Sequence, residues 1–305
     1  AKSDALGFPV EVFSYTEDLA TWPQAFGRAM EHSGAGTGRV GVEPRNLRVL
    51  ELRLLEAAAK DASFVSAEEI VSALRMFKDE SEISMMRNAV HLAQNALERT
   101  LPLVKEGITE REVASELTLQ LMRGGSEPEL PFNPIVAFGA ESANPHASPA
   151  DRGLEPGMLV LIDWGANLRG YMSDLTRTFA FGDVDAELVR ISEVVRDANK
   201  AGREAAGPGV PAGSVDDATR SVVEEAGYGQ YFIHRTGHGL GLEAHEEPYI
   251  RAGNDALLEP GMAFTVEPGI YLPGRGGVRI EDDVVITNDG AVSLSDLPRD
   301  LIRIG

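Results

Sequence analysis

The chain of 305 residues carries 48 acidic and 28 basic side chains, which gives it a formal net charge of −20 at pH 7. That charge repels polyphosphates, so it argues against nucleic acid or an anionic membrane surface as a partner and favours cations. The absence of cysteine excludes disulfides, thiol nucleophiles and thiolate metal ligands. A metal site in this chain must therefore be built from Asp, Glu and the six His residues.

The hydropathy of the chain gives no sign of a membrane span. The longest uninterrupted apolar run, residues 158–162, is far shorter than the roughly 18 residues that a span requires. The first residues also lack the apolar region of a signal peptide. We therefore expect a cytoplasmic protein with no membrane partner.

Residues 1–77 are expected to form a small α/β domain. They combine alternating apolar positions such as Val10 and Val12 with a helical stretch at residues 47–59. The long helix that follows marks a change of pattern, so we place the domain boundary near Lys78. The second domain then covers residues 78–305.

Four helices are predicted in the second domain. Apolar residues three or four apart predict a long helix over residues 84–104 with one face in a core. Thr109 followed by Glu112 is a capping box that opens a second helix, and two glycines end it. Two further helices are expected after Asp185 and after Ser214.

Apolar runs between these helices predict strands. They lie at residues 134–138, 158–164, 172–181, 263–271 and 278–287. Helices and strands alternate along the chain, but neighbouring strands are spaced as hairpins. The predicted class is therefore α+β with antiparallel sheets.

A short repeat suggests that the second domain has two related halves. The pentapeptide LEPGM at residues 154–158 recurs at residues 258–262, and an acid follows each copy at the same distance, Asp163 and Glu267. A duplication with pseudo-two-fold symmetry would produce this pattern. Chance recurrence of a Pro-Gly turn is the alternative.

The first hairpin is expected to bring two acids together. A two-residue turn at residues 168–169 would place Asp163 directly opposite Asp174, where like charges oppose folding. Because Asp163 follows an apolar run, its charge must be neutralised. A cation could do this, and nearby Arg169 or Arg177 is the alternative.

The second hairpin repeats the arrangement. Centred on Gly274, it places Glu267 opposite Glu281, unless a bulge near residues 268–269 shifts the register. The four carboxylates of the two hairpins would balance two divalent cations, with a neutral imidazole as a fifth ligand. Such oxygen-rich coordination suits Mn²⁺ or Co²⁺ better than a structural zinc.

Four histidines lie in loop-like sequence. His234 and His238 are four residues apart, but three glycines around His238 make a helix improbable and predict a glycine-rich loop. His146 lies between prolines, and His245 follows the glycine-rich segment. Imidazole titrates near neutral pH, so these residues are candidate proton carriers and oxyanion donors, with an exposed loop histidine as the alternative.

This constellation resembles the pita-bread metallopeptidases, the group that holds methionine aminopeptidase, Xaa-Pro aminopeptidase and prolidase. The likeness covers residues 78–305, and it rests on NPH at 144–146, LIDWGA at 161–166, SDLTRTF at 173–179, HRTGHGLG at 234–241, TVEPG at 265–269 and RIED at 279–282. The resemblance implies a pita-bread fold and two divalent metal ions, with Mn²⁺ as the expected metal and Co²⁺ or Zn²⁺ as alternatives. The implied ligands are Asp163, Asp174, His238, Glu267 and Glu281, with Asp174 and Glu281 bridging the ions.

The amino-terminal segment places the chain nearer one branch of that group. Residues 1–77 look like the latter part of the small domain found in the proline-specific members, creatinase included, shortened at its start. His234 and Arg279 also look like those members. The resemblance therefore implies cleavage of the bond between an N-terminal residue and proline, by a homodimer.

Roles for the site residues follow from the same resemblance. Metal-assisted hydrolysis is expected, with Glu267 as the base that takes a proton from water. His245 would donate a hydrogen bond to the developing oxyanion. His146 would orient the peptide or assist the leaving proline nitrogen, and His234 and Arg279 would shape the acidic network or bind the proline end of the substrate.

The favoured function is that of an Xaa-Pro dipeptidase (prolidase), with Arg275 or Arg279 as contacts for the free carboxylate of the dipeptide. One alternative is an Xaa-Pro aminopeptidase that acts on longer peptides with proline second. A creatinase-like hydrolase would not need the carboxylate cluster. A non-catalytic pita-bread binding protein is disfavoured because all five ligand types are retained.

Overall fold

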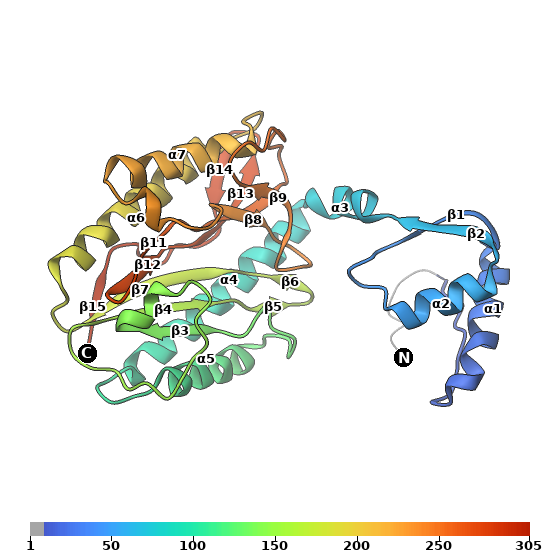
Figure 1. The fold of residues 1–305 in the computed structure, drawn as a ribbon, viewed down its shortest axis with the longest axis horizontal. Helices are drawn as coiled ribbons and strands as arrows, with labels where there is room; N and C mark the ends of the chain where they lie inside the picture. Colours follow the sequence, from blue (N-terminus) through green and yellow to red (C-terminus); the bar gives the residue numbers. More distant parts are fainter. Residues whose placement is uncertain (1–8) are drawn as a thin grey trace. The chain divides into compact units, whose positions relative to one another are not determined.

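The structure is a computed structural model that describes residues 9–305, and its contacts divide the chain after Leu74 into two compact units (Figure 1). The smaller unit is built on two parallel strands, β1 and β2, with helices between and beside them. Its elements, with the helix that leads into the larger unit, are α1 (Trp22–Ser33), β1 (Thr37–Val42), α2 (Val49–Ala58), β2 (Asp61–Ser66) and α3 (Glu68–Met76).

The alternating apolar positions Val10 and Val12, which contributed to the α/β expectation, do not form a strand. Residues 9–16 have no regular secondary structure, and both side chains are exposed. The sheet of this unit consists of β1 and β2, and among the described residues no strand pairs with residues 9–16. An unpaired extended segment leaves its backbone groups to water and gains nothing from the alternation.

The larger unit contains four helices, as predicted: α4 (Glu80–Thr100), α5 (Glu110–Gly124), α6 (Ala186–Ala205) and α7 (Ala212–Glu225). The capping box of Thr109 and Glu112 is confirmed, and Gly125 ends α5 in the left-handed conformation at φ 99°. The predicted start of α7 at Ser214 is wrong. The helix begins after Pro211, whose fixed φ suits a helix start, so Ser214 lies within the first turn.

Two antiparallel sheets form the centre of this unit. In the first, the strand order is β15-β7-β4-β3, with β15 and β7 parallel, and in the second it is β14-β13-β10-β8-β9. Two short ribbons, β5-β6 and β11-β12, extend their hairpins. The strands are β3 (Ile135–Phe138), β4 (Met158–Trp164), β5 (Asn167–Leu168), β6 (Tyr171–Met172), β7 (Leu175–Phe181), β8 (Gly237–Gly239), β9 (Glu246–Ile250), β10 (Ala263–Val266), β11 (Gly269–Leu272), β12 (Gly276–Arg279), β13 (Asp282–Thr287), β14 (Gly290–Ser293) and β15 (Ile302–Ile304).

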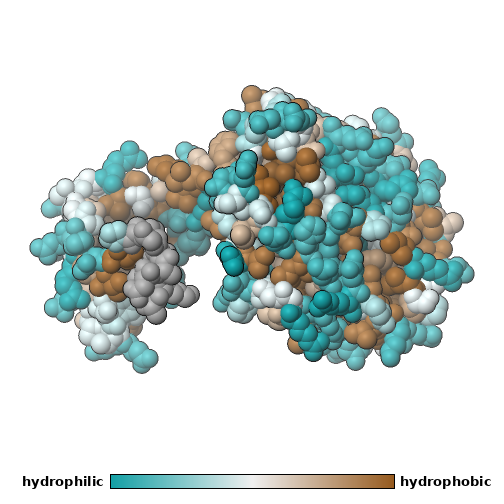
Figure 2. Space-filling view, turned by 180° about the vertical axis from the view of Figure 1, so that it is seen from behind, coloured by the Kyte–Doolittle hydropathy of each residue, from teal (hydrophilic) through white to brown (hydrophobic). Residues whose placement is uncertain are grey.

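The helices bury their apolar faces against these strands. Figure 1 shows α4 and α5 beside β3 and β4, and α6 and α7 beside the later strands. One apolar cluster joins α4 and α5 to the first sheet, and a second joins α6 and α7 to β11 and β12. On the face seen in Figure 2, hydrophilic residues of the larger unit surround smaller apolar patches. The predicted α+β class is confirmed, and within residues 9–305 no helix combines the length and apolarity needed to cross a membrane.

The first hairpin differs from the prediction by one residue in its turn. The two central residues are Arg169 and Gly170, both at positive φ, 54° and 90°, which is the combination that a type I′ turn needs. Moving the turn by one residue moves the strand pairing by two, so Asp163 faces Thr176 and not Asp174. The predicted direct pairing of Asp163 with Asp174 is therefore wrong.

The second hairpin has the predicted register. The pairs of β11 with β12 and of β10 with β13 are all centred on Gly274. The ladder is interrupted between these two parts, at Glu267 on one side and Glu281 on the other, but the register is the same before and after the interruption. The long strands predicted at 172–181, 263–271 and 278–287 are each broken in this way by acidic residues.

Candidate metal centre

Three of the predicted metal ligands lie at breaks between strands. Asp174 precedes β7, Glu267 lies between β10 and β11, and Glu281 lies between β12 and β13. The other two are inside strands, Asp163 near the end of β4 and His238 in the middle of β8. The three-residue strand β8 corrects the prediction of a loop at His238, although the absence of a helix is as expected.

The fold brings these five side chains together in a buried site. Ligand atoms of Asp174, His238 and Glu281 all lie within 4.8 Å of one another. His238 Nε2 is 3.6 Å from Asp174 Oδ2 and 3.4 Å from Glu267 Oε1. The Oδ1 atom of Asp163 is buried, and within residues 9–305 it has no hydrogen-bond partner.

Crowding and burial disfavour the charged forms of these acids. Burial raises the pKa of Asp174 well above its ordinary range, and the charges of Glu281 and Asp163 raise it further. Burial also raises the pKa of Glu281 well above its ordinary range, and it raises the pKa of Glu267 to about 7. Cations among these carboxylates would reverse that preference, so the donor set fits divalent ions.

The orientation of His238 suits a metal ligand. Its Nδ1 lies 3.1 Å from the carbonyl oxygen of Gly239, which favours the tautomer with the proton on Nδ1. Burial lowers the pKa of His238 well below its ordinary range, which keeps the ring neutral. Nε2 therefore presents a lone pair toward the carboxylates of Asp174 and Glu267.

The main chain at Asp174 and at Glu281 is hydrogen-bonded to a strand from the other part of the unit. The amide of Asp174 donates to Asp283 Oδ2 at 3.1 Å, from the second half of the unit. The amide of Glu281 donates to the carbonyl of Thr176 at 3.1 Å, from the first half, and Thr176 Oγ1 donates to Glu281 Oε2 at 2.6 Å. The segment at residues 174–176 and the segment at residues 281–283 therefore hold each other's candidate ligands in place.

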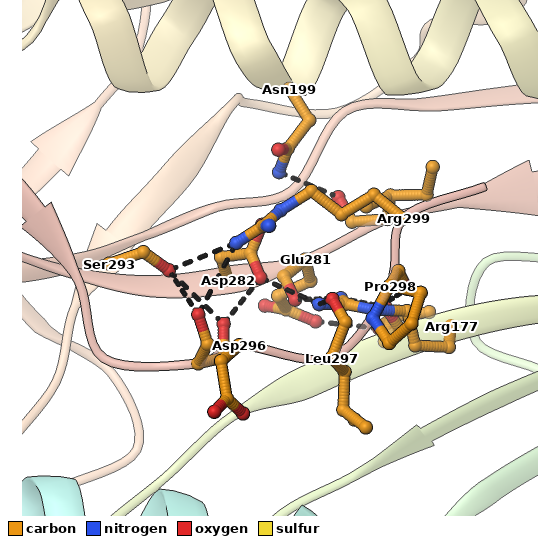
Figure 3. Close-up of polar contacts among 12 residues, drawn as sticks. Arg177, Asn199, Glu281, Asp282, Ser293, Asp296, Leu297, Pro298 and Arg299 are labelled. Atoms are coloured by element: carbon orange, nitrogen blue, oxygen red, sulfur yellow. Dashed lines mark hydrogen bonds and ion pairs between the residues drawn. The ribbon is translucent and has the colours of Figure 1, made fainter.

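An ion-pair network supports the segment after Glu281 (Figure 3). Arg177 donates to Asp282 Oδ1 at 2.8 Å and to the carbonyl of Glu281 at 2.7 Å, and Arg299 donates to Asp282 Oδ2 at 2.7 Å. Burial opposes ionisation of Asp282, but the two guanidinium groups hold its pKa below its ordinary range. Asp282 thus carries its charge outside the metal cluster and fixes the backbone beside Glu281.

Asn199 on helix α6 forms hydrogen bonds with the main chain just before each glutamate of the second hairpin. The side-chain amide of Asn199, seen in Figure 3, donates to the carbonyl of Val266 at 2.9 Å and more weakly to that of Ile280 at 3.4 Å. These carbonyls directly precede Glu267 and Glu281. The helix can come this close because Gly202 faces the strand: a Cβ there would lie 2.9 Å from Val266 Cγ1.

A second polar chain leads from Asp163 away from the cluster. Arg279 donates to Asp163 Oδ2 at 2.5 Å and to the Tyr271 hydroxyl at 2.9 Å, and that hydroxyl lies 2.8 Å from His234 Nε2. Burial lowers the pKa of His234 to about 4, so the ring is neutral at physiological pH. Tyr271 could not be singled out from the amino-acid sequence, because a tyrosine in an apolar strand is an ordinary core residue.

The two remaining candidate histidines are exposed at the site. The ring of His245 packs edge-on against His238 with the ring centroids 4.1 Å apart. The loop that carries His146 is tied to the polar chain, because the carbonyl of Pro145 accepts from Arg279 Nη1 at 3.4 Å. All nine predicted site residues therefore belong to one connected region of the larger unit.

Two family models match the sequence, one in each unit. Residues 84–288 match Metallopeptidase family M24, and residues 4–77 match the Creatinase/Prolidase N-terminal domain. A protein described as a putative dipeptidase YkvY of Bacillus subtilis is 40% identical over 97% of this chain and 81% of its own length. The Xaa-Pro dipeptidase of Lactobacillus delbrueckii subsp. lactis is 42% identical over 82% of this chain and 68% of its own.

Solved structures agree with these matches. A dipeptidase from Pyrococcus horikoshii superposes with a TM-score of 0.92 at 38% identity, covering 99% of this chain and 83% of its own. An X-Pro aminopeptidase from Thermotoga maritima superposes with a TM-score of 0.86 at 33% identity, covering 93% and 79%.

Proposed function

The chain belongs to metallopeptidase family M24, and from this premise we propose that it is an Xaa-Pro dipeptidase that hydrolyses the bond between an N-terminal residue and a terminal proline. The predictions of the proline-specific branch, the pita-bread fold and a metallo-exopeptidase are confirmed at the level of the family and its solved structures. The observation that carries the proposal is the buried cluster of Asp174, His238 and Glu281.

The proposed cofactor is a pair of divalent ions, Mn²⁺ in the first instance. They would be held by Asp163, Asp174, His238, Glu267 and Glu281. Two observations support this assignment: Oδ1 of Asp163 has no hydrogen-bond partner among the described residues, and the acids repel one another. When bound, such ions act as Lewis acids toward a carbonyl oxygen and promote ionisation of water.

Three side chains of the site have proposed roles in proton transfer, oxyanion stabilisation and substrate orientation. Glu267 would take the proton from water: its side chain is 15% exposed, more than those of Asp163 and Asp174 at 11% and 7%, so it is the acid nearest to solvent among the three. His245, exposed and packed on His238, would donate a hydrogen bond to the developing oxyanion. His146 would orient the peptide or protonate the leaving nitrogen.

Other parts of the proposal concern the whole protein. We propose a homodimer in the cytoplasm and a domain boundary near Lys78. The second candidate function is that of an Xaa-Pro aminopeptidase, which the superposition on the Thermotoga maritima structure favours. The two candidates differ in whether the site accepts a residue beyond proline.

Chelation followed by reconstitution tests the proposed function. The protein treated with EDTA should lose hydrolysis of Ala-Pro and recover it with Mn²⁺. Ala-Pro should be cleaved in preference to Ala-Pro-Ala, and the reverse preference would support the aminopeptidase. Asp174→Asn should lose both bound metal and turnover, whereas Asp183→Asn, at a side chain that is 91% exposed, should keep both. Turnover by Asp174→Asn with full metal occupancy would contradict the proposal.

A further inference from the structure

A dipeptide substrate poses an electrostatic problem for this site, and the inference rests on the proposed function above. The proline end of such a dipeptide carries a free carboxylate, which must come close to a cluster of buried acids. Two divalent ions would be balanced by four carboxylates, so they leave no excess positive charge. A cationic side chain of the protein near the proline end would therefore favour binding of that carboxylate.

The two arginines expected for this role are already engaged. Arg279 has a side chain only 4% exposed, and its donors bond Asp163, Tyr271 and other acceptors inside the site. Arg275 pairs with Asp185 at 3.1 Å on the surface. Both guanidinium groups therefore already have acidic partners, one inside the site and one on the surface.

Arg235 is differently placed. It lies two residues before β8, and its guanidinium carbon stands 4.7 Å from the centroid of the Tyr249 ring. Its side chain is half-buried, and among residues 9–305 no carboxylate pairs with it and no acceptor takes a hydrogen bond from its guanidinium group. Stacking on an aromatic face immobilises a guanidinium group and leaves its N–H donors available at the edge.

The ring on which Arg235 stacks belongs to the strand beside the one that carries His238. Tyr249 belongs to β9, which pairs with the strand that carries His238: Gly237 faces Ile250, and Gly239 faces Glu246. Tyr249 therefore lies at one end of the ladder, and His245 precedes the other end. Burial lowers the pKa of His245 and the charge of Arg235 lowers it further, as expected for a cation close by.

We propose that Arg235 binds the free carboxylate of the terminal proline and so selects dipeptides over longer peptides. Tyr249 is then a positioning residue, because its ring holds the guanidinium plane. A guanidinium group suits this task, since it can donate two parallel hydrogen bonds to one carboxylate. A peptide extended beyond proline has a neutral amide at the same place and gains nothing from the charge.

The test compares Ala-Pro with Ala-Pro amide, which differ only in the charge at the proline end. For Arg235→Gln we expect kcat/KM on Ala-Pro to fall about 10- to 100-fold, mostly through KM, because hydrogen bonds to a charged group have that value. The kcat/KM on Ala-Pro amide should stay within about 3-fold of the parent enzyme, which also shows that the variant is folded and loaded with metal. Arg235→Lys should recover part of the preference for the carboxylate.

Arg190→Gln is the matched control and should leave both substrates unchanged, because the guanidinium carbon of exposed Arg190 also stands over a tyrosine ring, 5.8 Å from the centroid of Tyr228, but on α6 and outside the site. Equal losses on both substrates in Arg235→Gln would overturn the inference and give Arg235 a structural role. Unchanged activity on both would also overturn it. A parent enzyme that cleaves neither substrate with Mn²⁺ would instead refute the proposed function itself, and the inference with it.

Discussion

A buried ion pair next to the candidate metal centre leads to a specific prediction for the free energy of unfolding. Lys78, just before α4, places Nζ 2.5 Å from Glu246 Oε1, and the two side chains are only 2% and 7% exposed. The pair joins the start of α4 to the residue directly after His245. Nζ has one further acceptor, the carbonyl of Met76 at 3.3 Å, and Glu246 Oε2 has no hydrogen-bond partner within residues 9–305.

Lys78→Met removes the cation and leaves the carboxylate of Glu246 buried. Breaking one side of such a pair costs about 3–5 kcal/mol of unfolding free energy. For a domain of this size, about 2–4 °C per kcal/mol gives a midpoint lower by about 6–20 °C. The double variant Lys78→Met/Glu246→Leu should recover most of the loss, because apolar side chains of similar volume replace a buried pair at little net cost.

Urea unfolding gives the free energy and thermal unfolding gives the midpoint, both followed by circular dichroism with EDTA present so that metal binding does not contribute. Lys200→Met is the matched control: Lys200 pairs with Glu204 at 3.8 Å with both side chains largely exposed, and it should change the unfolding free energy by less than about 1 kcal/mol. A loss below about 1 kcal/mol for Lys78→Met, or a double variant less stable than either single one, would refute the reasoning.

Three further predictions concern the packing and the polar chain around the site. Asn199→Leu should weaken Mn²⁺ binding about 10- to 100-fold by calorimetry, since it frees the carbonyls before both glutamates; Ser192→Ala on the same helix should not. Gly202→Ala should cost about 1–3 kcal/mol in denaturant unfolding, because its Cβ would lie 2.3 Å from Thr219 Oγ1, whereas Gly207→Ala has room and should cost little. Because burial lowers the pKa of His234 to about 4, below the value of about 6.5 in an unfolded chain, the folded protein binds fewer protons between these values. The contribution of neutral His234 to the free energy of unfolding should be complete above pH 6.5 and be lost as the pH falls to about 4. In His234→Gln the free energy of unfolding should therefore decrease less steeply over that pH range.

The sequence was a good guide where the signal is local. The capping box at Thr109 uses residues three apart, and the hairpin around Gly274 is short enough for its turn to fix the register. The first hairpin failed because several neighbouring residues are compatible with a two-residue turn. Only the backbone showed that Arg169, a residue that rarely takes positive φ, occupies the first turn position.

The site could be predicted from its acids but not from their supports. Asp163 was conspicuous because a charge in an apolar strand needs neutralising. Asn199, Arg235 and Lys78 were not conspicuous, since their residue types are common on helices, loops and surfaces. Their roles depend on partners far along the chain: Lys78 and Glu246 are 168 residues apart. Such contacts leave no spacing that a single sequence reveals.

The reciprocal bonds between the two halves have a consequence for dissecting the protein. Asp283 of the later half holds the amide of Asp174, and Thr176 of the earlier half holds both the amide and the carboxylate of Glu281. A fragment that ends before α7 would keep Asp163 and Asp174 but would lose Asp283, whose carboxylate holds the amide of Asp174. Metal binding therefore depends on contacts between the two parts of the unit. If two fragments divided before α7 are produced separately and mixed, the return of metal binding would report that they have reassembled.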